Sequence, residues 1–591
     1  MTFLSKFKYF SRWAILGTII GVISGFGAVM FFILLQLSSA FLIGFIGGYS
    51  LPPPGGEINF FSLISTSIVS WRIPLILTIG GLISGTIVYR FAPEAEGHGT
   101  DAYISAFHYK NGRIRKRVPL IKAIASSIVI GSGGSAGREG PIAQIGAGFG
   151  SWLVTKFNLS DNDRRTAIIC GAAGGIGAIF KAPLGGAIFA IEVLYKRDLE
   201  VKALLPSFIS SIVAYSIFGL FFGFQPIFIT PQFNLNIDNL PFYAILGLSC
   251  AGFAIIFTKL FYYIKDKAFA KLKISKMLKP AIGCGLMGFI ALFLPEVLGP
   301  GYGIIQLTID GQYTLLILLI IIFAKIVVTS LTIGSGGSGG VFAPSLVIGS
   351  TIGGFIAVLF RSLFPFFHLE IAAFTVVGMA AFITAVANVP IASIIMVSEM
   401  TNTHTLLVQS MLACSVAYIF SQKWSIYESQ VKNQTYSPVH RGKYIKDVLE
   451  TLKARDIMNK DLISVNSKQN IKELFDLVKE SGRSGFPVID SGEFVGIIVY
   501  RDLFKVPPDK MESTYIESCM TKNVITGYPD DNAFDILDKI ENYGYGRLPI
   551  VDPTNPHKIL GIITKRDVLR AREIRRSKLL LEGESESINP K

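Results

Sequence analysis

The residues most able to do chemistry are Arg138 and Glu139, a charged pair inside an otherwise apolar stretch. They lie in the glycine-rich segment 131–146, GSGGSAGREGPIAQIG, where Pro141 suits the first turn of a helix. A helix start presents free N–H groups and a partial positive charge, so it attracts anions. Ionisable residues at membrane depth mark ion or proton pathways. The segment therefore predicts an anion site with a titratable carboxylate, Glu139, beside it.

A second copy of this segment occurs in the other half of the apolar region. Residues 334–344, GSGGSGGVFAP, keep Gly, Ser and Pro in step and carry Val341 and Phe342 in place of the charged pair. Residues 171–192 likewise match residues 378–399. An internal duplication with segments interrupted by glycine and proline indicates a transport site at the repeat interface, near the bilayer midplane.

The composition is that of a membrane protein with a polar tail. Of the 591 residues, 51% are hydrophobic and 16% are charged, which is too apolar for an ordinary soluble protein. Residues 1–440 hold 30 Lys and Arg against 17 Asp and Glu, and residues 441–591 hold 25 against 24. The five cysteines form no CxxC or Cys/His cluster, so we expect neither a disulfide framework nor a metal site.

Long uncharged runs predict a multi-pass topology. The run 13–56 exceeds the roughly 20 residues that cross about 30 Å of hydrocarbon, so we expect a retained, tilted helix and an outer loop at 52–56. The runs 123–137 and 166–180, about 15 residues each, are too short to cross cleanly, which is tolerated only for helices that are buried in protein or line a cavity. Basic loops such as 110–117 place both ends of the membrane part in the cytoplasm, and we interpret them as topology determinants rather than ligand sites.

The tail contains two similar units, residues 454–507 and 516–573. Each has a Pro-containing strand followed by a strand that runs into a helix, which indicates small α/β units. The Pro-containing strands are expected at 485–490 and 547–552, and the strand-to-helix segments at 496–502 and 561–567. A linker is expected at 436–453, and the polar segment 578–591 is expected to be disordered.

Several short motifs carry a family resemblance. Residues 137–141 read GREGP, residues 340–344 read GVFAP, and Trp424-Ser-Ile-Tyr427 ends at the position where the family has its pore tyrosine. With the two tail units, which resemble CBS modules, the chain is similar to the CLC chloride channel and transporter family, in the form of a prokaryotic-type member with a C-terminal CBS pair. The resemblance covers nearly the whole chain.

The resemblance implies the architecture. It predicts an all-α polytopic membrane domain, residues 1–435, made of inverted repeats at about 12–225 and 240–430 with broken and tilted helices, followed by the cytoplasmic α/β CBS pair. It also implies a homodimer in the plasma membrane, with a pore in each protomer for chloride, and either proton-coupled exchange or passive flow through that pore. It implies no catalytic residue, no required cofactor and no nucleic-acid partner.

The resemblance also implies which residues act. Glu139 would be the gating carboxylate, because at about 4 Å two negative charges repel by roughly 4 kcal/mol at an effective dielectric near 20. The anion would be bound by His98, Gly99, Gly137, Arg138, Gly140, Val341, Phe342, Ala343 and Tyr427. The alternatives are that Glu139 is a structural carboxylate paired with Arg138, and that Phe342 is a packed core aromatic.

Two departures from the family pattern bear on selectivity and coupling. Residues 97–101 read GHGTD where the family usually has GSGIP, so His98 replaces a serine and Asp101 a proline. Whether His98 faces the ion or the cytoplasmic vestibule stays open, and Asp101 is expected to be a helix-start carboxylate. Val193 stands where antiporters carry an internal proton glutamate, so coupling stays open, while Glu192, mirrored by Glu399, is expected to be structural.

The CBS pattern for an adenine nucleotide is complete only in the second unit, with Thr564 and Asp567. The first unit has Val499 in place of the hydroxyl residue and retains Asp502. We therefore expect at most one nucleotide site in each chain, with a purely structural, dimerising role as the alternative.

The sequence thus predicts chloride transport gated by Glu139, either as chloride/proton exchange or through a passive channel, with regulation by the CBS pair. A CBS-regulated divalent-cation transporter is a third candidate, disfavoured because the apolar segments offer few acidic residues for a cation path. A phosphate-binding enzyme is disfavoured because the glycine-rich segment 131–146 lacks a GK[ST] ending and a preceding strand.

Overall fold

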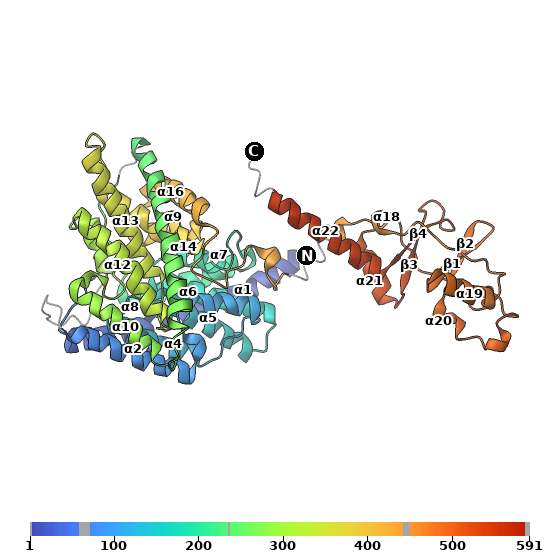
Figure 1. Cartoon of the computed structure of the whole chain (residues 1–591), viewed down its shortest axis with the longest axis horizontal. Coiled ribbons are helices and arrows are strands. Elements are labelled where there is room, and N and C mark those ends of the chain that lie inside the picture. The colour runs from blue at the N-terminus through green and yellow to red at the C-terminus, as the bar shows by residue number, and fades with distance from the viewer. Residues whose placement is uncertain (1–2, 58–70, 234–236, 441–448, 586–591) are drawn as a thin grey trace. The chain divides into compact units, whose positions relative to one another are not determined.

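The computed structural model describes residues 3–57, 71–233, 237–440 and 449–585. The chain divides into two compact units, residues 1–439 and 440–591, which are described separately here. The first unit is helical and the second contains both helices and strands (Figure 1). The helical unit holds the apolar sequence, and the second unit holds the polar tail.

The helical unit contains two series of eight α-helices within the described residues. The first series is α1 (Phe3–Ser39), α2 (Arg72–Phe91), α3 (Thr100–Tyr109), α4 (Val118–Gly131), α5 (Glu139–Lys156), α6 (Asp161–Ile179), α7 (Pro183–Glu192) and α8 (Leu204–Phe222). The second series is α9 (Leu240–Tyr262), α10 (Lys279–Phe293), α11 (Tyr302–Ile309), α12 (Leu315–Gly334), α13 (Phe342–Leu363), α14 (Ile371–Ala387), α15 (Pro390–Thr401) and α16 (Leu407–Ser421). Short helical turns, η2 (Pro93–Ala95) and η6 (Pro295–Val297), occupy matching places before α3 and α11.

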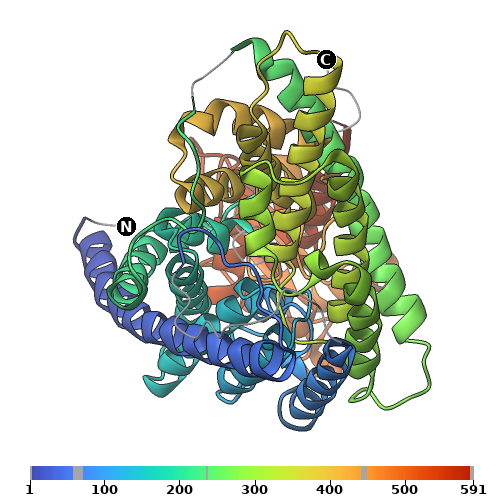
Figure 2. The same ribbon diagram turned by 90° about the vertical axis from the view of Figure 1, so that its left-hand side faces the viewer.

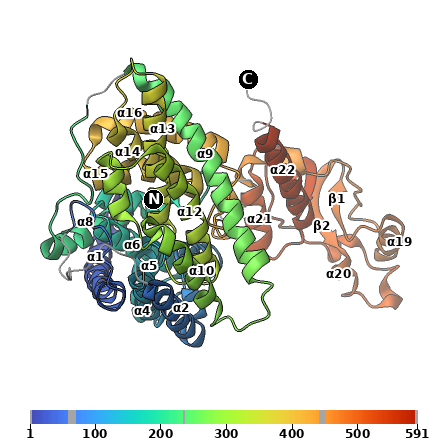
Figure 3. The same ribbon diagram turned by 60° about the vertical axis from the view of Figure 1, so that its left-hand side comes forward.

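The two series pack in the same way. Helix α1 packs against α6 and α8, and α9 packs against α14 and α16. Helices α2 and α10 pack against each other, and so do α7 and α15. Figure 2 shows α1 and α9 at opposite edges of the helical unit, and Figure 3 shows α9 running along its edge beside α12. This repeated packing confirms the internal duplication that the sequence predicts.

The helix lengths agree with a broken-helix membrane domain. In the described residues, seven helical segments are long and apolar enough to cross a membrane, and the first spans Ser11–Ile46 because α1 continues as the π-helix η1 (Ala40–Ile46). Helices α4 and α7 have 14 and 10 residues, too few to cross about 30 Å of hydrocarbon. Helix α6 is longer than its uncharged run, since the polar residues from Asp161 onward form its first turns.

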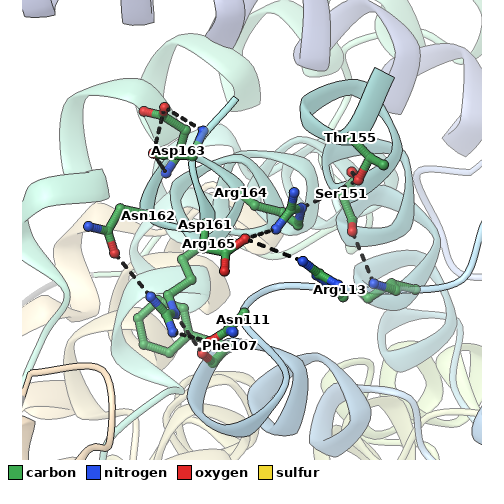
Figure 4. A network of polar contacts seen from close by, with 12 residues as sticks. Phe107, Asn111, Arg113, Ser151, Thr155, Asp161, Asn162, Asp163, Arg164 and Arg165 are labelled. Atoms are coloured by element: carbon green, nitrogen blue, oxygen red, sulfur yellow. Dashed lines mark hydrogen bonds and ion pairs between the residues drawn. The ribbon is translucent and has the colours of Figure 1, made fainter. Parts of the chain in front are cut away.

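The basic loop 110–117 is fixed to the start of α6 (Figure 4). Arg165 donates to the carbonyl of Phe107 and to the side-chain oxygen of Asn111, and the backbone N–H of Ile114 donates to Ser151 at 3.0 Å. Asn111 turns the chain with φ of 52°, a value that asparagine tolerates better than most residues. These contacts support the interpretation of the loop as a structural element.

The second unit contains two small antiparallel sheets. Strand β1 (Gly485–Asp490) pairs with β2 (Glu493–Val499), and β3 (Arg547–Val551) pairs with β4 (Ile559–Thr564). The remaining helices are α18 (Ala454–Ile457), α19 (Ile471–Ser481), α20 (Tyr500–Leu503), α21 (Ala533–Asn542) and α22 (Lys565–Ser585). All four predicted strands are therefore present, within a few residues of their expected bounds.

The two CBS-like units exchange their opening segments. Asn459, from the start of the first unit, bridges to Ile562 in β4, and Thr521, from the start of the second, bridges to Ile497 in β2. The core around β3 and β4 accordingly includes Ala454. Separate boundaries at 454–507 and 516–573 describe the sequence units, but each sheet is completed by residues from the other unit.

The expectation of a disordered tail from Lys578 is wrong for residues 578–585, which continue α22. The segment from Lys565 to Ser585 is rich in Leu, Arg, Lys and Glu, and these side chains lose little conformational freedom in a helix. Charge and polarity alone suggested disorder, whereas the helix propensity of these residues favours continuation. The last residues of the predicted tail lie outside the described part of the chain.

Candidate functional site

The two glycine-rich segments meet at Gly137 and Gly340. The N–H of Gly137 donates to the carbonyl of Gly340 at 2.7 Å, and the N–H of Gly340 donates back to the carbonyl of Gly137 at 2.6 Å. These bonds bring the starts of α5 and α13 side by side. A Cβ atom built on either glycine would collide with the carboxylate of Glu139, so glycine is needed at both positions.

The carboxylate of Glu139 occupies a buried niche, bounded by Gly137, Gly340, Tyr302 and Ala343. Tyr302 donates its hydroxyl to Oε1 at 3.2 Å, and the backbone N–H groups of Ala343 and of Glu139 itself face the carboxylate. Oε2 closes no hydrogen bond of ordinary geometry within the described residues. A negative group therefore lies among donors, and one of its oxygens is without a partner.

Two further helix starts reach this niche. Tyr302 is the first residue of α11 and Thr100 is the first of α3. Gly99, at φ of 77°, packs so closely on the carbonyl of Gly140 that a side chain would not fit. The N-terminal ends of α3, α5, α11 and α13 thus converge, and each contributes free N–H groups and partial positive charge. This arrangement suits a small anion, for which the Glu139 carboxylate is a covalently attached stand-in.

Two buried lysines hold the turns that precede α3 and α11. Lys122 donates to the carbonyls of Ala95 and Gly97 at 2.9 and 2.6 Å. Lys325 donates in the same way, to the carbonyls at Val297 and Gly299, at 2.9 and 2.8 Å. Both ammonium groups are fully buried. They satisfy carbonyls that the short turns leave without helical partners, and they add positive charge near the niche.

His98 lies beside Tyr427 inside the protein. Its ring centroid is 5.3 Å from that of Tyr427 and 6.3 Å from that of Phe261, and 8% of its surface is exposed. The Nδ1 atom has no hydrogen-bond partner in the described part of the chain. His98 is therefore buried beside Tyr427, and the question whether it faces the ion or the cytoplasmic vestibule stays open.

Asp101 fixes the segment that carries Tyr427. It lies in the first turn of α3, as predicted, and its two carboxylate oxygens accept from the N–H and the hydroxyl of Ser429, both at 2.8 Å. The hydroxyl of Tyr427 also contacts the side chain of Thr100. The GHGTD segment and the Tyr427 segment are therefore held together by side-chain hydrogen bonds.

The side chain of Arg138 binds Glu57, and its charge is within electrostatic reach of Glu139. Its guanidinium pairs with the Glu57 carboxylate through both terminal nitrogens and lies over the rings of Phe32, Phe180 and Tyr302, with its carbon 4.7 to 5.7 Å from their centroids. Among the described residues, the ion-pair partner of Arg138 is Glu57 and not Glu139, which disfavours the alternative of a structural Arg138–Glu139 pair. Arg138 thus anchors Glu57, which follows the predicted outer loop 52–56, while the Glu139 carboxylate occupies the niche.

Val341 and Phe342 begin α13 at the niche, and the Phe342 ring packs in the core. Its centroid lies 5.3 Å from that of Phe180 and 5.7 Å from that of Phe189. The core-packing alternative thus describes the ring correctly, while the backbone of Phe342 remains at the start of α13 beside Ala343. Val341 precedes it as the buried N-cap residue.

Glu192 and Glu399 cap helices in the opposite repeat. Glu192 accepts from the N–H groups of Ile391 and Ala392 at the start of α15. Glu399 accepts from the N–H groups at Leu184 and Gly185, at the start of α7. Each carboxylate lies against the positive end of a helix. The structural role expected for Glu192 is confirmed, and its neighbour Val193 is fully buried.

The predicted nucleotide residues lie in the second unit of the chain, in a local turn between β4 and α22. Thr564 donates its N–H and its hydroxyl to Oδ2 of Asp567, at 2.9 and 2.6 Å. In the first CBS-like unit Asp502 accepts from the N–H of Val499 and pairs with Lys505. Both Thr564 and Asp567 remain partly exposed, so a hydroxyl and a carboxylate are accessible at this turn.

Sequence reasoning missed four residues that build the site: Tyr302, Glu57, Lys122 and Lys325. The lysines had a detectable signal, because each is an isolated charge 19 residues before the proline of its pentad, Pro141 or Pro344. Tyr302 stands in GPGYG, which matches GHGTD, so the repeat alignment places it opposite Thr100. Glu57 gave no such signal, since its partner lies far away in sequence.

The geometry agrees with comparisons to known proteins. Residues 80–422 match the profile described as the voltage gated chloride channel family, and residues 454–509 and 516–574 match CBS domains. The chain belongs to the voltage-gated chloride channel, or CLC, family. As a CLC member it is a multi-pass membrane protein with a CBS pair after the membrane domain.

Curated relatives of this CLC protein are named as exchangers. The H(+)/Cl(-) exchange transporter ClcA of Vibrio parahaemolyticus is 31% identical over 357 residues, covering 59% of this chain and 76% of the relative. The protein of the same name from Citrobacter koseri is 32% identical over 380 residues, covering 62% of this chain and 80% of the relative.

Solved structures confirm the fold. A slow cyanobacterial Cl⁻/H⁺ antiporter aligns with a TM-score of 0.59 at 24% identity, covering 70% of this chain and 93% of the other. A CLC-type fluoride/proton antiporter aligns with a TM-score of 0.61 at 24% identity, covering 73% and 100%. A eukaryotic CLC transporter aligns over 95% of this chain and 98% of its own, with a TM-score of 0.55 at 19% identity.

Proposed function

We propose that the protein transports chloride across the membrane through a pore in each protomer of a homodimer, gated by Glu139. The observation that carries this proposal is the Glu139 carboxylate, seated where four helix starts converge and with Oε2 unpartnered among the described residues. An anion and a carboxylate that compete for one niche repel by roughly 4 kcal/mol at about 4 Å. Protonation of Glu139 removes the charge and frees the niche for the anion.

The proposed anion path follows the residues around the niche. Backbone groups of Gly137, Gly140 and Ala343 bind the anion, and Arg138, Val341 and Phe342 contribute through their backbone, since their side chains are engaged elsewhere. Gly99 lets the start of α3 approach Gly140. His98 and Tyr427 line the path on the side of α3.

Exchange of chloride for protons is the preferred mode. Several relatives carry exchange in their names, and Glu139 supplies a group that binds a proton and an anion alternately. The passive channel is the second candidate, favoured by the fully buried Val193, which offers no acid at that position. The two modes differ in whether a chloride gradient drives proton movement in sealed liposomes.

The test is chloride efflux from liposomes that contain the purified full chain. We expect wild-type efflux to respond to pH, and Glu139→Gln, which cannot ionise, to remove that response while chloride still flows. Glu399→Gln is the matched control, because it alters a buried carboxylate at a helix start outside the niche. Absence of chloride efflux in the wild type would end the proposal, and magnesium flux in its place would favour the cation transporter.

The CBS pair is proposed to lie in the cytoplasm, with both chain ends, and to regulate transport in the plasma membrane. CBS domains as a class bind adenine nucleotides, and Thr564 and Asp567 would hold the ribose through a hydroxyl and a carboxylate. Titration calorimetry of the full chain with ATP and AMP tests this assignment. Thr564→Val should abolish the heat of binding. Val499→Thr is the reciprocal change, which restores the hydroxyl residue that the first unit lacks.

A further inference from the structure

The pore contains a second titratable group besides Glu139, the imidazole of His98. The two groups lie toward different ends of the pore. Glu139 neighbours Arg138, whose guanidinium binds Glu57 at the predicted outer loop. His98 lies within electrostatic reach of Lys265, in a basic segment predicted to be cytoplasmic. The hydroxyl of Tyr427 is within electrostatic reach of Glu139, and its ring contacts His98.

A proton that has reached Glu139 needs another acceptor to continue inward, and an acceptor needs a lone pair that no hydrogen bond already holds. The carboxylates of Glu192 and Glu399 each accept from two backbone amides, and Asp101 accepts twice from Ser429. Both ring nitrogens of His108 are hydrogen-bonded, at 2.9 Å each. These groups are committed to structural bonds.

His98 differs from them. Its Nδ1 has no hydrogen-bond partner within the described residues, although the side chain is more than nine-tenths buried. A buried polar atom without a partner loses a hydrogen bond that water would provide. We interpret this unpartnered nitrogen, which lies beside Tyr427, as an atom that bonds to a transported species. An imidazole nitrogen is suited to a proton, since histidine titrates nearest to neutral pH.

The charged groups around His98 come from three elements. Burial has the largest influence and disfavours a positively charged imidazolium, Asp101 from α3 attracts it, and Lys265 from the π-helix η5 (Tyr263–Phe269) and Lys122 from α4 repel it. Tyr427 and Phe261 supply the adjacent rings. Because burial and the two lysines oppose the charge that Asp101 favours, an imidazolium formed here readily releases its proton.

We propose that His98 is the inner proton acceptor of the pore, which relays protons between Glu139 and the cytoplasm. The proton leaves the carboxylic acid of Glu139, passes along the pore wall at the Tyr427 hydroxyl and binds Nδ1 of His98, forming an imidazolium. The imidazolium then releases a proton to cytoplasmic water and returns to the neutral ring. This inference rests on the proposed chloride transport. It assigns the mode of transport as chloride/proton exchange and names His98 as the residue that transfers the proton on the cytoplasmic side.

The test records chloride and proton movement simultaneously in liposomes that contain the full chain. We expect wild-type protein to move protons against chloride, and His98→Asn and His98→Ser to lower the number of protons moved per chloride at least tenfold, whatever change they make to chloride flux itself. The pH dependence of the proton-to-chloride ratio should disappear in both variants. A purely structural role for His98 would instead lower both fluxes together and leave their ratio unchanged.

The matched control is His108→Asn, which removes a buried imidazole whose nitrogens are both bonded, and its ratio should equal that of the wild type. An unchanged ratio in His98→Asn or His98→Ser overturns the inference, as does wild-type chloride flux that moves no protons. In the second case chloride transport itself would stand. Absence of any wild-type chloride flux would instead overturn the proposed function on which the relay depends.

Discussion

The two halves of the membrane domain share the same helix arrangement but carry different side chains at the niche. Two hydrogen bonds between side-chain hydroxyls join the halves: Ser126 bonds Ser338 at 3.0 Å, and Thr329 bonds Ser135 at 2.8 Å. Matching residues therefore exchange partners, as they do in an isologous two-fold contact. The reciprocal hydrogen bonds between Gly137 and Gly340 join the two halves at the centre of this contact. The buried lysines and the capping glutamates occur once in each half, in matching roles.

The two halves differ at the positions that face the niche. Glu139 in the first half corresponds to Phe342 in the second, and His98 and Thr100 correspond to Pro300 and Tyr302. The symmetric residues place four helix starts together, and the asymmetric ones fill the space with one carboxylate, one imidazole and two phenols. The duplicated helices thus position the helix starts around the niche. The difference between the two sides of the niche comes from residues that are not the same in the two halves.

The largest expected effect concerns Arg138, whose counterpart is the apolar Val341. Arg138→Met leaves the carboxylate of Glu57 nearly buried and unpaired, and we expect a loss of about 3–5 kcal/mol in stability. Thermal unfolding of the purified chain in detergent measures it. The double variant Arg138→Met with Glu57→Gln should recover most of the loss, because the second half shows that this position accepts an uncharged residue. A double variant as unstable as the single one would contradict this reading of the comparison.

The two buried lysines test how far the two halves match. Lys325→Met leaves the carbonyls of Val297 and Gly299 without a donor among the described residues, and we expect it to lower stability by about 2 kcal/mol. After Lys122→Met the carbonyls of Ala95 and Gly97 still accept from the Ser338 hydroxyl and the Gly339 N–H, so the same unfolding measurement should show a smaller loss, about 1 kcal/mol. Chloride affinity should fall more for Lys122→Met, because Lys122 also faces His98. A loss of stability in Lys122→Met as large as that in Lys325→Met would contradict this difference in hydrogen bonding.

The capping glutamates should give the smallest effect. Glu192→Gln and Glu399→Gln each keep one acceptor oxygen and lose the charge at a helix start, so each should cost about 1 kcal/mol in stability. The two changes are expected to be additive, since they act on different helices. Neither should alter the ratio of protons to chloride, and a change in that ratio for Glu192→Gln would bring this carboxylate into the proton path.

Much of the helix arrangement of the membrane domain could be predicted from the sequence. The duplicated GSGGS segments, the prolines in step and the uncharged runs predicted a repeated, broken-helix membrane domain, because helix starts and span lengths depend on local sequence. The role of Glu192 as a structural residue followed from its mirror image at Glu399. The strand positions in the tail followed from the alternation of β-branched and helical segments.

The details of the site depend on contacts across the fold. Glu57 and Arg138 lie 81 residues apart, and only the packing of the outer loop shows that they pair. Tyr302 reaches Glu139 from the other half of the chain, over 163 residues. The extension of α22 through residues 578–585 was missed for the opposite reason: the polarity of this segment indicated disorder, while its residues favour a helix.

The central claim is that the Glu139 carboxylate and a permeating anion occupy the same niche, and chloride binding to the purified full chain tests it most directly. Isothermal titration calorimetry at neutral pH should show that Glu139→Gln binds chloride at least tenfold more tightly than the wild type, because the competing charge is gone. Equal affinity in the two proteins, or weaker binding by Glu139→Gln, would contradict the account.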